Sequence, residues 1–480
     1  MTQELTYEDL AFPTFINSHP AITLTAYEVK DEKVVEKTIT LPFSDAIKAA
    51  EISGVGQLHI GDTRTGKSLV MMDMHRNHFG GKADDGGRSN WNVARNDFTA
   101  NGYFMTADQS KIGAGKGLLN EARVPIKRRI NAVVNWLDEI NLMIPEVQVE
   151  AFGMAEGRQE DIQLGDVETG YYLFGASCNL NRVNGDFAGV SPINRALLNR
   201  CGVIFDHDFY KTTDEDRDIL DGREVTGKLQ LAPIRDITDK IITAYQEIRK
   251  SASVRDPFLD AYLRFISSGL DYCSIDKDNL KKRTWPSRCS GCTFTKKDLC
   301  SLVKQSNTGT VATLKRFANG LKYLVQLKHG QTSIDPLDLA LAAYEFTTYH
   351  GNLNGVEAQS TYSGEDQEQM RDVVSKLRDK IMSIRRYLDR SIDNAIETGI
   401  AETRFIEISD VRGQKVNNIY SEADKERLDE IIKQNGKISY NVQEPFKRAE
   451  SEKFAKENGI RIDWFPGYLN SVAENYAKVK

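Results

Sequence analysis

The chain has 480 residues, of which 40% are hydrophobic and 28% are charged, and its formal net charge is −6. This composition is typical of a soluble globular protein with two or three domains, and it gives no general electrostatic attraction to nucleic acid or to an anionic membrane. No apolar run approaches the roughly 18 residues of a membrane span, and the first residues lack a signal-peptide pattern. We therefore expect a cytoplasmic protein.

The first regular element expected along the chain is a β-hairpin at residues 22–43, because two alternating segments flank a charged turn. From there to about residue 225, short apolar strands alternate with helical or glycine-containing segments, which predicts a parallel sheet flanked by helices. The next segment is mostly helical. We predict an α/β domain at 1–225, a helical lid at 226–350, and a linker with a helical C-terminal domain at 351–480.

The segment LHIGDTRTGKSLVMMD, residues 58–73, is typical of a strand, a loop and a helix. Such a glycine-rich turn aims backbone N–H groups at phosphate oxygens. Lys67 would neutralise the β- and γ-phosphates of ATP, and the Ser68 hydroxyl would bind Mg²⁺. A strand–helix turn without a ligand is the alternative. The residues that match the loop pattern are Gly61, Asp62, Thr63, Arg64, Thr65, Gly66, Lys67 and Ser68.

An apolar strand that ends in two acids follows further along, in INAVVNWLDEIN. Asp138 can hold the Mg²⁺ shell, and Glu139 can polarise an attacking water. A strand end that meets solvent would look the same by itself. Together with the glycine-rich loop, however, the adjacent carboxylates favour an ATPase over a passive nucleotide binder, which needs no water-activating acid.

The order of these segments resembles AAA+ ATPases, in particular the MoxR-like branch. That branch has a helix with an inserted hairpin after the two acids, and residues 145–181 are similar to it, with Val147, Gln148, Met154 and Glu156 in register. The resemblance implies a P-loop AAA+ fold, in which a parallel sheet lies between helices, with a helical lid. It also implies a hexameric ring of identical subunits.

Two further segments carry the resemblance, GASCNLNRVNGDF and RALLNRCGVIFD. It places Asn179 at the sensor-1 position, where an amide orients the attacking water. It places Arg200 at the arginine finger, which reaches the γ-phosphate of a neighbouring subunit. Arg182 and Arg195 lie close enough in the sequence to compete for that role, and the proline that normally follows the sensor-1 asparagine is absent.

The resemblance extends into the lid, residues 311–346. The sensor-2 position falls on Thr313 instead of an arginine, and Lys315 or Arg316 could substitute. This departure leaves open how the nucleotide state would be coupled to lid movement. The resemblance spans roughly residues 45–350.

Four of the six cysteines fall within residues 273–300, where the family has a short loop. The C-x₂-C pair with two outlying cysteines predicts one structural zinc ion, with an iron–sulfur cluster or unmetallated thiols as alternatives. Cys178 and Cys201 fit core strands and are more simply buried. The predicted metal ligands are Cys273, Cys289, Cys292 and Cys300.

Beyond the linker, a capping box at Ser363 and Asp366 opens a helix, and Gly399 follows as its stop. This helix forms either a helical seam or an amphipathic helix packed on its own domain. Its apolar positions are Met370, Val374, Leu377, Ile381, Ile384, Leu388 and Ala395.

For function, the resemblance implies an ATPase that remodels a protein partner, which in this family often carries a von Willebrand A domain, and the outcome is often metal insertion or complex maturation. The alternative is a nucleic-acid motor, since residues 425–463 could form a helix–turn–helix. Residues 421–480 show no excess of basic charge.

Overall fold

A computed structural model describes most of the chain, which divides by internal contacts into two compact units. One unit comprises residues 1–255, 307–353 and 364–371, and the other comprises 256–306, 354–363 and 372–480. The predicted domain boundaries at 225 and 350 remain a prediction. The described residues are 4–30, 33–80, 91–94, 105–107, 126–128, 132–143, 145–159, 162–166, 168–179, 195–198, 200–222, 224–225, 228–229, 234–253, 256–269, 299–303, 308–330, 333–347, 353, 366–412 and 465–477.

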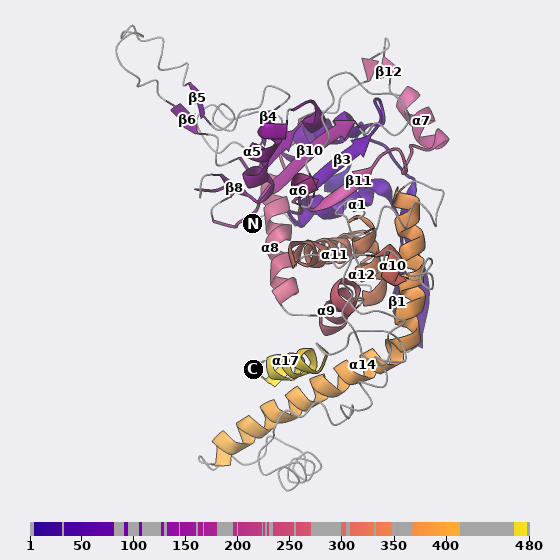
Figure 1. The fold of residues 1–480 in the computed structure, drawn as a ribbon, viewed down its shortest axis with the longest axis vertical. Coiled ribbons are helices and arrows are strands. Elements are labelled where there is room, and N and C mark those ends of the chain that lie inside the picture. The colour runs from indigo at the N-terminus through magenta and orange to yellow at the C-terminus, as the bar shows by residue number, and fades with distance from the viewer. Residues whose placement is uncertain are drawn as a thin grey trace. The chain divides into compact units, whose positions relative to one another are not determined.

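The first unit is built on a five-stranded parallel sheet with the order β11-β3-β10-β7-β4 (Figure 1). The strand order departs from the sequence order, so crossover connections join the parallel strands, and the described helices α2 (Lys67–Asp73), α5 (Pro145–Ala155) and α6 (Arg195–Leu198) each lie in one of them. The prediction of a parallel sheet flanked by helices is confirmed. The strands are β3 (Gln57–Gly61), β4 (Trp91–Ala94), β7 (Val134–Leu137), β10 (Leu173–Asn179) and β11 (Val203–Asp206).

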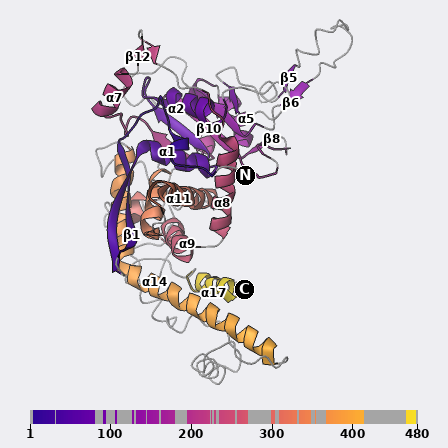
Figure 2. The same ribbon diagram turned by 180° about the vertical axis from the view of Figure 1, so that it is seen from behind.

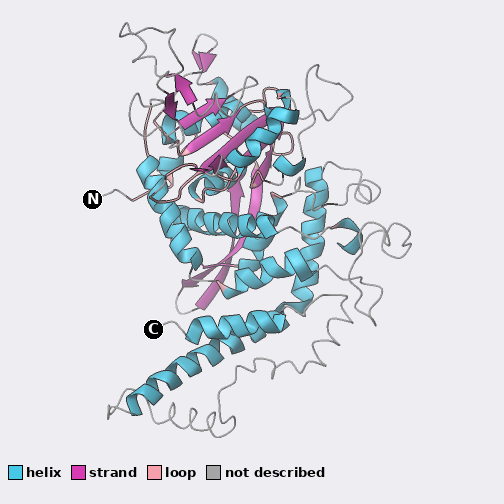
Figure 3. Cartoon of the chain, turned by 60° about the vertical axis from the view of Figure 1, so that its left-hand side comes forward, coloured by secondary structure: helices cyan, strands magenta, loops and turns pink. Residues whose placement is uncertain are grey.

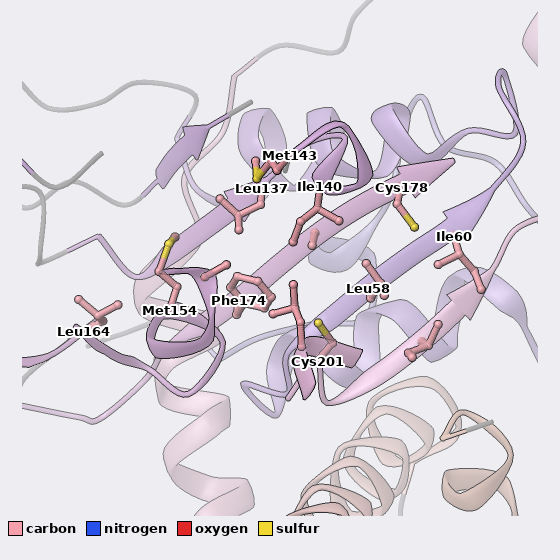
Figure 4. Close-up of a cluster of buried hydrophobic side chains, with 14 residues drawn as sticks. Leu58, Ile60, Leu137, Ile140, Met143, Met154, Leu164, Phe174, Cys178 and Cys201 are labelled. Carbon is pink, nitrogen blue, oxygen red and sulfur yellow. The ribbon is translucent and has the colours of Figure 1, made fainter. Parts of the chain in front are cut away.

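Both faces of this sheet are covered, which explains why its central strands read as apolar runs. Strands β3, β7 and β11 are buried at every position. On one face, apolar side chains of the sheet pack with those of α5 (Pro145–Ala155) and α6 (Arg195–Leu198), and Cys178 and Cys201 are buried thiols there, as predicted (Figure 4).

On the other face lies α1 (Phe43–Ile52), which contacts α8 (Thr238–Ser253) and α11 (Thr308–His329) (Figure 2). Gly320 of α11 lets the two helices approach closely, since a Cβ there would lie 2.4 Å from Ala49 O. The helices of the predicted lid that contact α1 therefore belong to the same unit as the sheet. The remaining helices of this unit are α2 (Lys67–Asp73), α7 (Asp214–Asp221) and α12 (Pro336–Glu345).

A long hairpin precedes the sheet, formed by β1 (Pro20–Lys30) and β2 (Lys33–Pro42). Strand β14 (Ser333–Ile334) extends it to three strands, so a segment more than 300 positions away in the sequence joins the hairpin. Shorter pairs are β5 (Met105–Ala107) with β6 (Ile126–Arg128), β8 (Arg158–Gln159) with β9 (Ile162–Gln163), and β12 (Glu224–Val225) with β13 (Lys228–Leu229).

The second unit is helical among its described residues (Figure 3). Its N-terminal helix, α9 (Pro257–Arg264), is capped by Asp256, whose carboxylate accepts from two backbone N–H groups, and Pro257 suits the first helical position. The other helices are α10 (Leu299–Leu302), most of α14 (Asp366–Arg412) and α17 (Phe465–Ala477).

The predicted end of the C-terminal helix at Gly399 is wrong, because α14 continues through it to Arg412. A Cβ at Gly399 would lie 2.3 Å from Ala473 O of α17. The glycine therefore serves close helix packing rather than termination. The apolar face is buried within the chain, with Val373 rather than Val374 in the buried set, as the amphipathic alternative expects.

Among the described helices, none has both the length and the apolarity that crossing a bilayer takes. The predicted linker at 351–366, apart from Leu353 and Asp366, and the predicted helix–turn–helix at 425–463 lie outside the described residues.

Candidate nucleotide-binding site

The predicted loop and the predicted acids meet at one edge of the parallel sheet. The loop follows β3, the two acids follow β7, and β10 lies between these strands. In the pairing register, Asn179 is opposite Gly61, and Ala176 is opposite Leu137. The carboxyl edge of an open α/β sheet is where such folds bind ligands.

The loop has the strained backbone that its sequence pattern demands. Gly66 has a φ of +94°, and a Cβ there would lie 2.9 Å from the ring of Phe15. Arg64 also has a positive φ of 65°, which costs a residue with a Cβ about 1–3 kcal/mol. Asp62, Thr63, Arg64 and Ser68 are exposed, and Thr65 and Gly66 are partly exposed, so the outer side of the loop is open to a ligand.

Lys67 begins helix α2 and turns back over the loop. Its Nζ donates to Gly61 O at 2.9 Å, to Asp62 O, and to Thr65 Oγ1 at 3.2 Å. Burial lowers the pKa of Lys67, and the thiol of Cys178 and the carboxylates of Asp208, Asp62 and Asp138 oppose that shift. The ammonium group therefore lies between the loop and the acid-bearing strand end.

Ser177 of β10 connects the two predicted acids, and sequence reasoning missed it. Its hydroxyl donates to Asp138 Oδ1 and accepts from the backbone N–H of Glu139 at 3.2 Å. Asp138 is 7% exposed, and Glu139 adopts the left-handed conformation with a φ of 53°. Strain of this kind clusters at functional positions.

Asn179, the predicted sensor 1, ends β10 and is partly exposed. Its carbonyl accepts from Asn141 Nδ2 at 2.8 Å, which ties the strand end to the turn after Glu139. The structure thus brings together Lys67, Asp138, Glu139 and Asn179 from three neighbouring strand ends.

Arg200, the predicted arginine finger, lies elsewhere. It lines a cavity of about 710 Å³ with Gly56 and Gly202, which precede β3 and β11 at the amino edge of the sheet. β3 has five residues, so about 16 Å of strand separates this cavity from the loop. Within this chain, Arg200 therefore lies too far from Lys67 to contact a ligand bound there.

The guanidinium of Arg200 is held in place from three sides. Its Nε donates to Glu156 Oε1 at 2.5 Å, its Nη1 donates to Ala196 O at 3.0 Å, and it stacks 4.6 Å from the ring centroid of Phe152. The Arg200 side chain is 34% exposed and that of Glu156 is 50% exposed. Arg182 and the side chain of Arg195, the competing arginines, lie outside the described residues.

Thr313 and Arg316 of α11 line the same cavity as Arg200, together with Arg158. Lys315 is not among the lining residues. Of the two cations that could substitute at the predicted sensor-2 position, Arg316 is therefore the one beside Arg200.

The side chains of all four clustered cysteines lie outside the described residues. Among the residues that are described, no group of three or more His, Cys, Asp or Glu side chains is arranged to hold a metal ion. The predicted centre at Cys273, Cys289, Cys292 and Cys300 remains a prediction.

The N-terminal segment also packs on the loop, although no motif predicts it. Asp73, at the end of α2, accepts from Thr14 N and Phe15 N, each at 2.7 Å, and from Thr14 Oγ1. These bonds place Phe15 against Gly66. Burial raises the pKa of Asp73, and these hydrogen bonds oppose the shift.

No protein-family model and no curated protein matches the chain. Among solved structures, it is similar to a candidate ATPase from Cytophaga hutchinsonii, with 15% sequence identity and a TM-score of 0.45. That similarity covers 69% of this chain and 88% of the other. At this level of similarity, the fold and the function rest on the chain's own geometry: a parallel α/β sheet with a glycine-rich loop and paired acids at its carboxyl edge.

Proposed function

We propose that the chain is a magnesium-dependent ATPase of the AAA+ type. The observation that carries the proposal is the convergence of Lys67, Asp138 and Glu139 at the carboxyl edge of the sheet. The glycine-rich loop lies beside them and leads into the N-terminus of helix α2, where backbone N–H groups favour a phosphate. The residues fit Mg²⁺ and ATP, because Ser68 supplies an exposed hydroxyl and Asp138 a carboxylate, which are the hard oxygen ligands that Mg²⁺ prefers.

In this proposal, Lys67 exchanges its bonds to the loop carbonyls for the β- and γ-phosphates. Ser68 and Asp138 would hold Mg²⁺, and the ion would neutralise negative charge that develops on the phosphate. Glu139 accepts a proton from the attacking water, and Asn179 orients that water. Phosphate release that requires both ATP and Mg²⁺ tests the assignment.

Ser177→Ala tests how the two acids are held. The variant removes the donor to Asp138 and the acceptor for the Glu139 N–H, so we expect turnover to fall about 10-fold or more. Ser177→Thr keeps the hydroxyl and should retain most of the activity. Steady-state phosphate release decides it, and equal rates in Ser177→Ala and wild type would show that this bridge has no role in turnover.

We further propose a ring of identical subunits, six by the family resemblance, in which Arg200 completes the site of a neighbour. The separation of Arg200 from Lys67 within one subunit supports this, as does the partial exposure of its side chain. A guanidinium near the γ-phosphate stabilises charge in the transition state and contributes about 10³–10⁵-fold to turnover in other nucleotide hydrolases. Arg316 would act at the same interface.

Subunit mixing tests this arrangement. Arg200→Ala and Glu139→Gln subunits should each be inactive alone, and mixed assemblies should regain part of the activity, because some interfaces then pair an intact acid with an intact arginine. Arg217→Ala is the control, since that arginine is exposed and forms an ion pair with nearby Asp214 on the same helix, α7. A monodisperse monomer in the presence of ATP would contradict the ring.

The output that we propose for the cycle is remodelling of a protein partner, such as a von Willebrand A domain protein, in metal insertion or complex maturation. Support comes from the family resemblance and from the acidic net charge, which does not favour nucleic acid. DNA or RNA that stimulates ATP hydrolysis would favour the motor alternative instead.

We also propose one metal centre at the four clustered cysteines, because a C-x₂-C pair with two further thiolates suits a tetrahedral ion. Elemental analysis should find about one equivalent of zinc, or iron with a brown colour in anaerobic protein. Cys292→Ser should release the metal and leave nucleotide binding at Lys67 intact. A total of less than about 0.1 equivalent of zinc and iron would show that the four cysteines are thiols without a metal.

A further inference from the structure

A buried chain of three polar side chains ends on the glycine-rich loop, and the proposed mechanism does not use it. Gln57 Oε1 lies 3.1 Å from His59 Nε2, His59 Nδ1 lies 2.9 Å from His207 Nε2, and His207 Nδ1 lies 3.2 Å from Thr65 O. The three side chains are at most 1% exposed. They therefore reach the loop from inside the protein.

This row of hydrogen-bonded side chains lies between strands β3 and β11, with aromatic rings packed against it. His59 lies on β3, opposite Phe205 of β11, and His207 follows β11. Trp136 and Phe205 lie against the His59 ring, and Phe15 and Phe43 lie against the His207 ring. Burying polar groups here costs free energy unless every one is hydrogen-bonded. Apolar side chains would fill the same space without that requirement.

Both imidazoles are neutral at physiological pH. Burial, and then the charge of Lys67, lowers the pKa of His207 to about 3, and burial with the charges of His207 and Lys67 holds the pKa of His59 well below its usual value. A neutral imidazole has one N–H donor and one acceptor nitrogen. Once the donor and acceptor are known for the hydrogen bond at Thr65, they are therefore known for every hydrogen bond back to Gln57.

Thr65 O can only accept, so His207 carries its proton on Nδ1 and accepts at Nε2. His59 must then donate from Nδ1 and accept at Nε2. Gln57 must present its NH₂ group to His59, which requires its amide to be turned by 180°, an assignment that heavy-atom positions do not distinguish. The turn gives up the 3.4 Å hydrogen bond from Gln57 to Ile47 O and brings the Gln57 oxygen toward that carbonyl, a cost confined to a contact that is already at the long limit for a hydrogen bond.

This order fixes a peptide plane of the loop. A trans peptide points its C=O and N–H in opposite directions, so holding Thr65 O toward His207 directs the Gly66 N–H to the opposite side. At the other end of the loop, Asp208 accepts the Asp62 N–H with both carboxylate oxygens, at 2.8 and 3.0 Å. The two residues after β11 thus hold the loop at both ends.

We propose that the Gln57–His59–His207 chain is a positioning element that aims the Gly66 N–H at a bound phosphate. The inference rests on the proposed function of the loop. His207 touches no substrate in this role; it acts through Thr65. Its removal should weaken phosphate binding because the donor is no longer oriented before the ligand arrives.

The test compares His207→Phe, which keeps an aromatic ring but has no donor, with His207→Asn, whose Nδ2 can replace the Nδ1 donor. We expect His207→Phe to bind Mg-ATP and inorganic tripolyphosphate about 10-fold more weakly by calorimetry, and by the same factor, because the effect acts on phosphate. His207→Asn should restore most of that affinity. His329→Gln, an exposed change at the end of α11, is the control.

Nitrogen-15 NMR of the two histidines provides a readout that needs no nucleotide, and it should show the Nδ1–H form for both. A His207 protonated at Nε2 alone would overturn the proposal, as would His207→Phe protein that binds both ligands as tightly as wild type. If wild-type protein binds neither ligand, the proposed function fails, and the NMR result still decides the proton order.

Discussion

Replacing Glu139 with glutamine should lower ATP turnover about 10²–10⁴-fold while leaving nucleotide binding near wild type. The amide has the shape of the carboxylate but cannot take a proton from water. It also tolerates the left-handed backbone at this position no worse than glutamate does, so no new strain is introduced. Binding isotherms and phosphate release, measured on the same preparation, separate the two effects.

Two further variants make the result specific. Lys67→Ala should lose binding itself, because it removes the ammonium group that would contact the β- and γ-phosphates. Glu168→Gln, at an exposed loop position, should match wild type in both assays. Turnover by Glu139→Gln at the wild-type rate would show that another group activates the water.

Gly175→Ala should destabilise the sheet by about 3 kcal/mol or more, which is at the high end for overpacking a core. A Cβ at this position would lie 2.0 Å from Cε3 of the Trp136 ring, and Trp136 is fully buried opposite it on β7. The indole cannot move toward solvent, so strands β7 and β10 must separate. We expect the thermal midpoint to fall by about 6 °C or more.

The control is Gly467→Ala on α17, where a Cβ meets nothing within 4 Å. Alanine favours a helix over glycine, so this change should be neutral or stabilising. Adding Trp136→Leu to Gly175→Ala should recover part of the loss, since it removes the ring that clashes. A Gly175→Ala midpoint equal to wild type would mean that the two strands separate at no cost.

The sequence by itself predicted the residues of the candidate site and most of the local structure. The glycine-rich loop and the adjacent acids at Asp138 and Glu139 are short contiguous patterns, so they can be recognised without knowing the fold. The hairpin and the parallel sheet follow from periodicity for the same reason. The rule that a glycine ends a helix failed at Gly399, because this glycine lies inside α14 and lets α17 pack closely against it.

Only the tertiary structure decided which distant residues support that chemistry. Ser177 reaches both acids from the neighbouring strand, Phe15 packs on Gly66, and His207 and Asp208 hold the loop from the far side of β3. None of these residues has a pattern of its own, because a serine or a histidine in a buried strand is compatible with many roles. Their function comes from strand order, which places residues more than a hundred positions apart in the chain within hydrogen-bonding distance of the same loop.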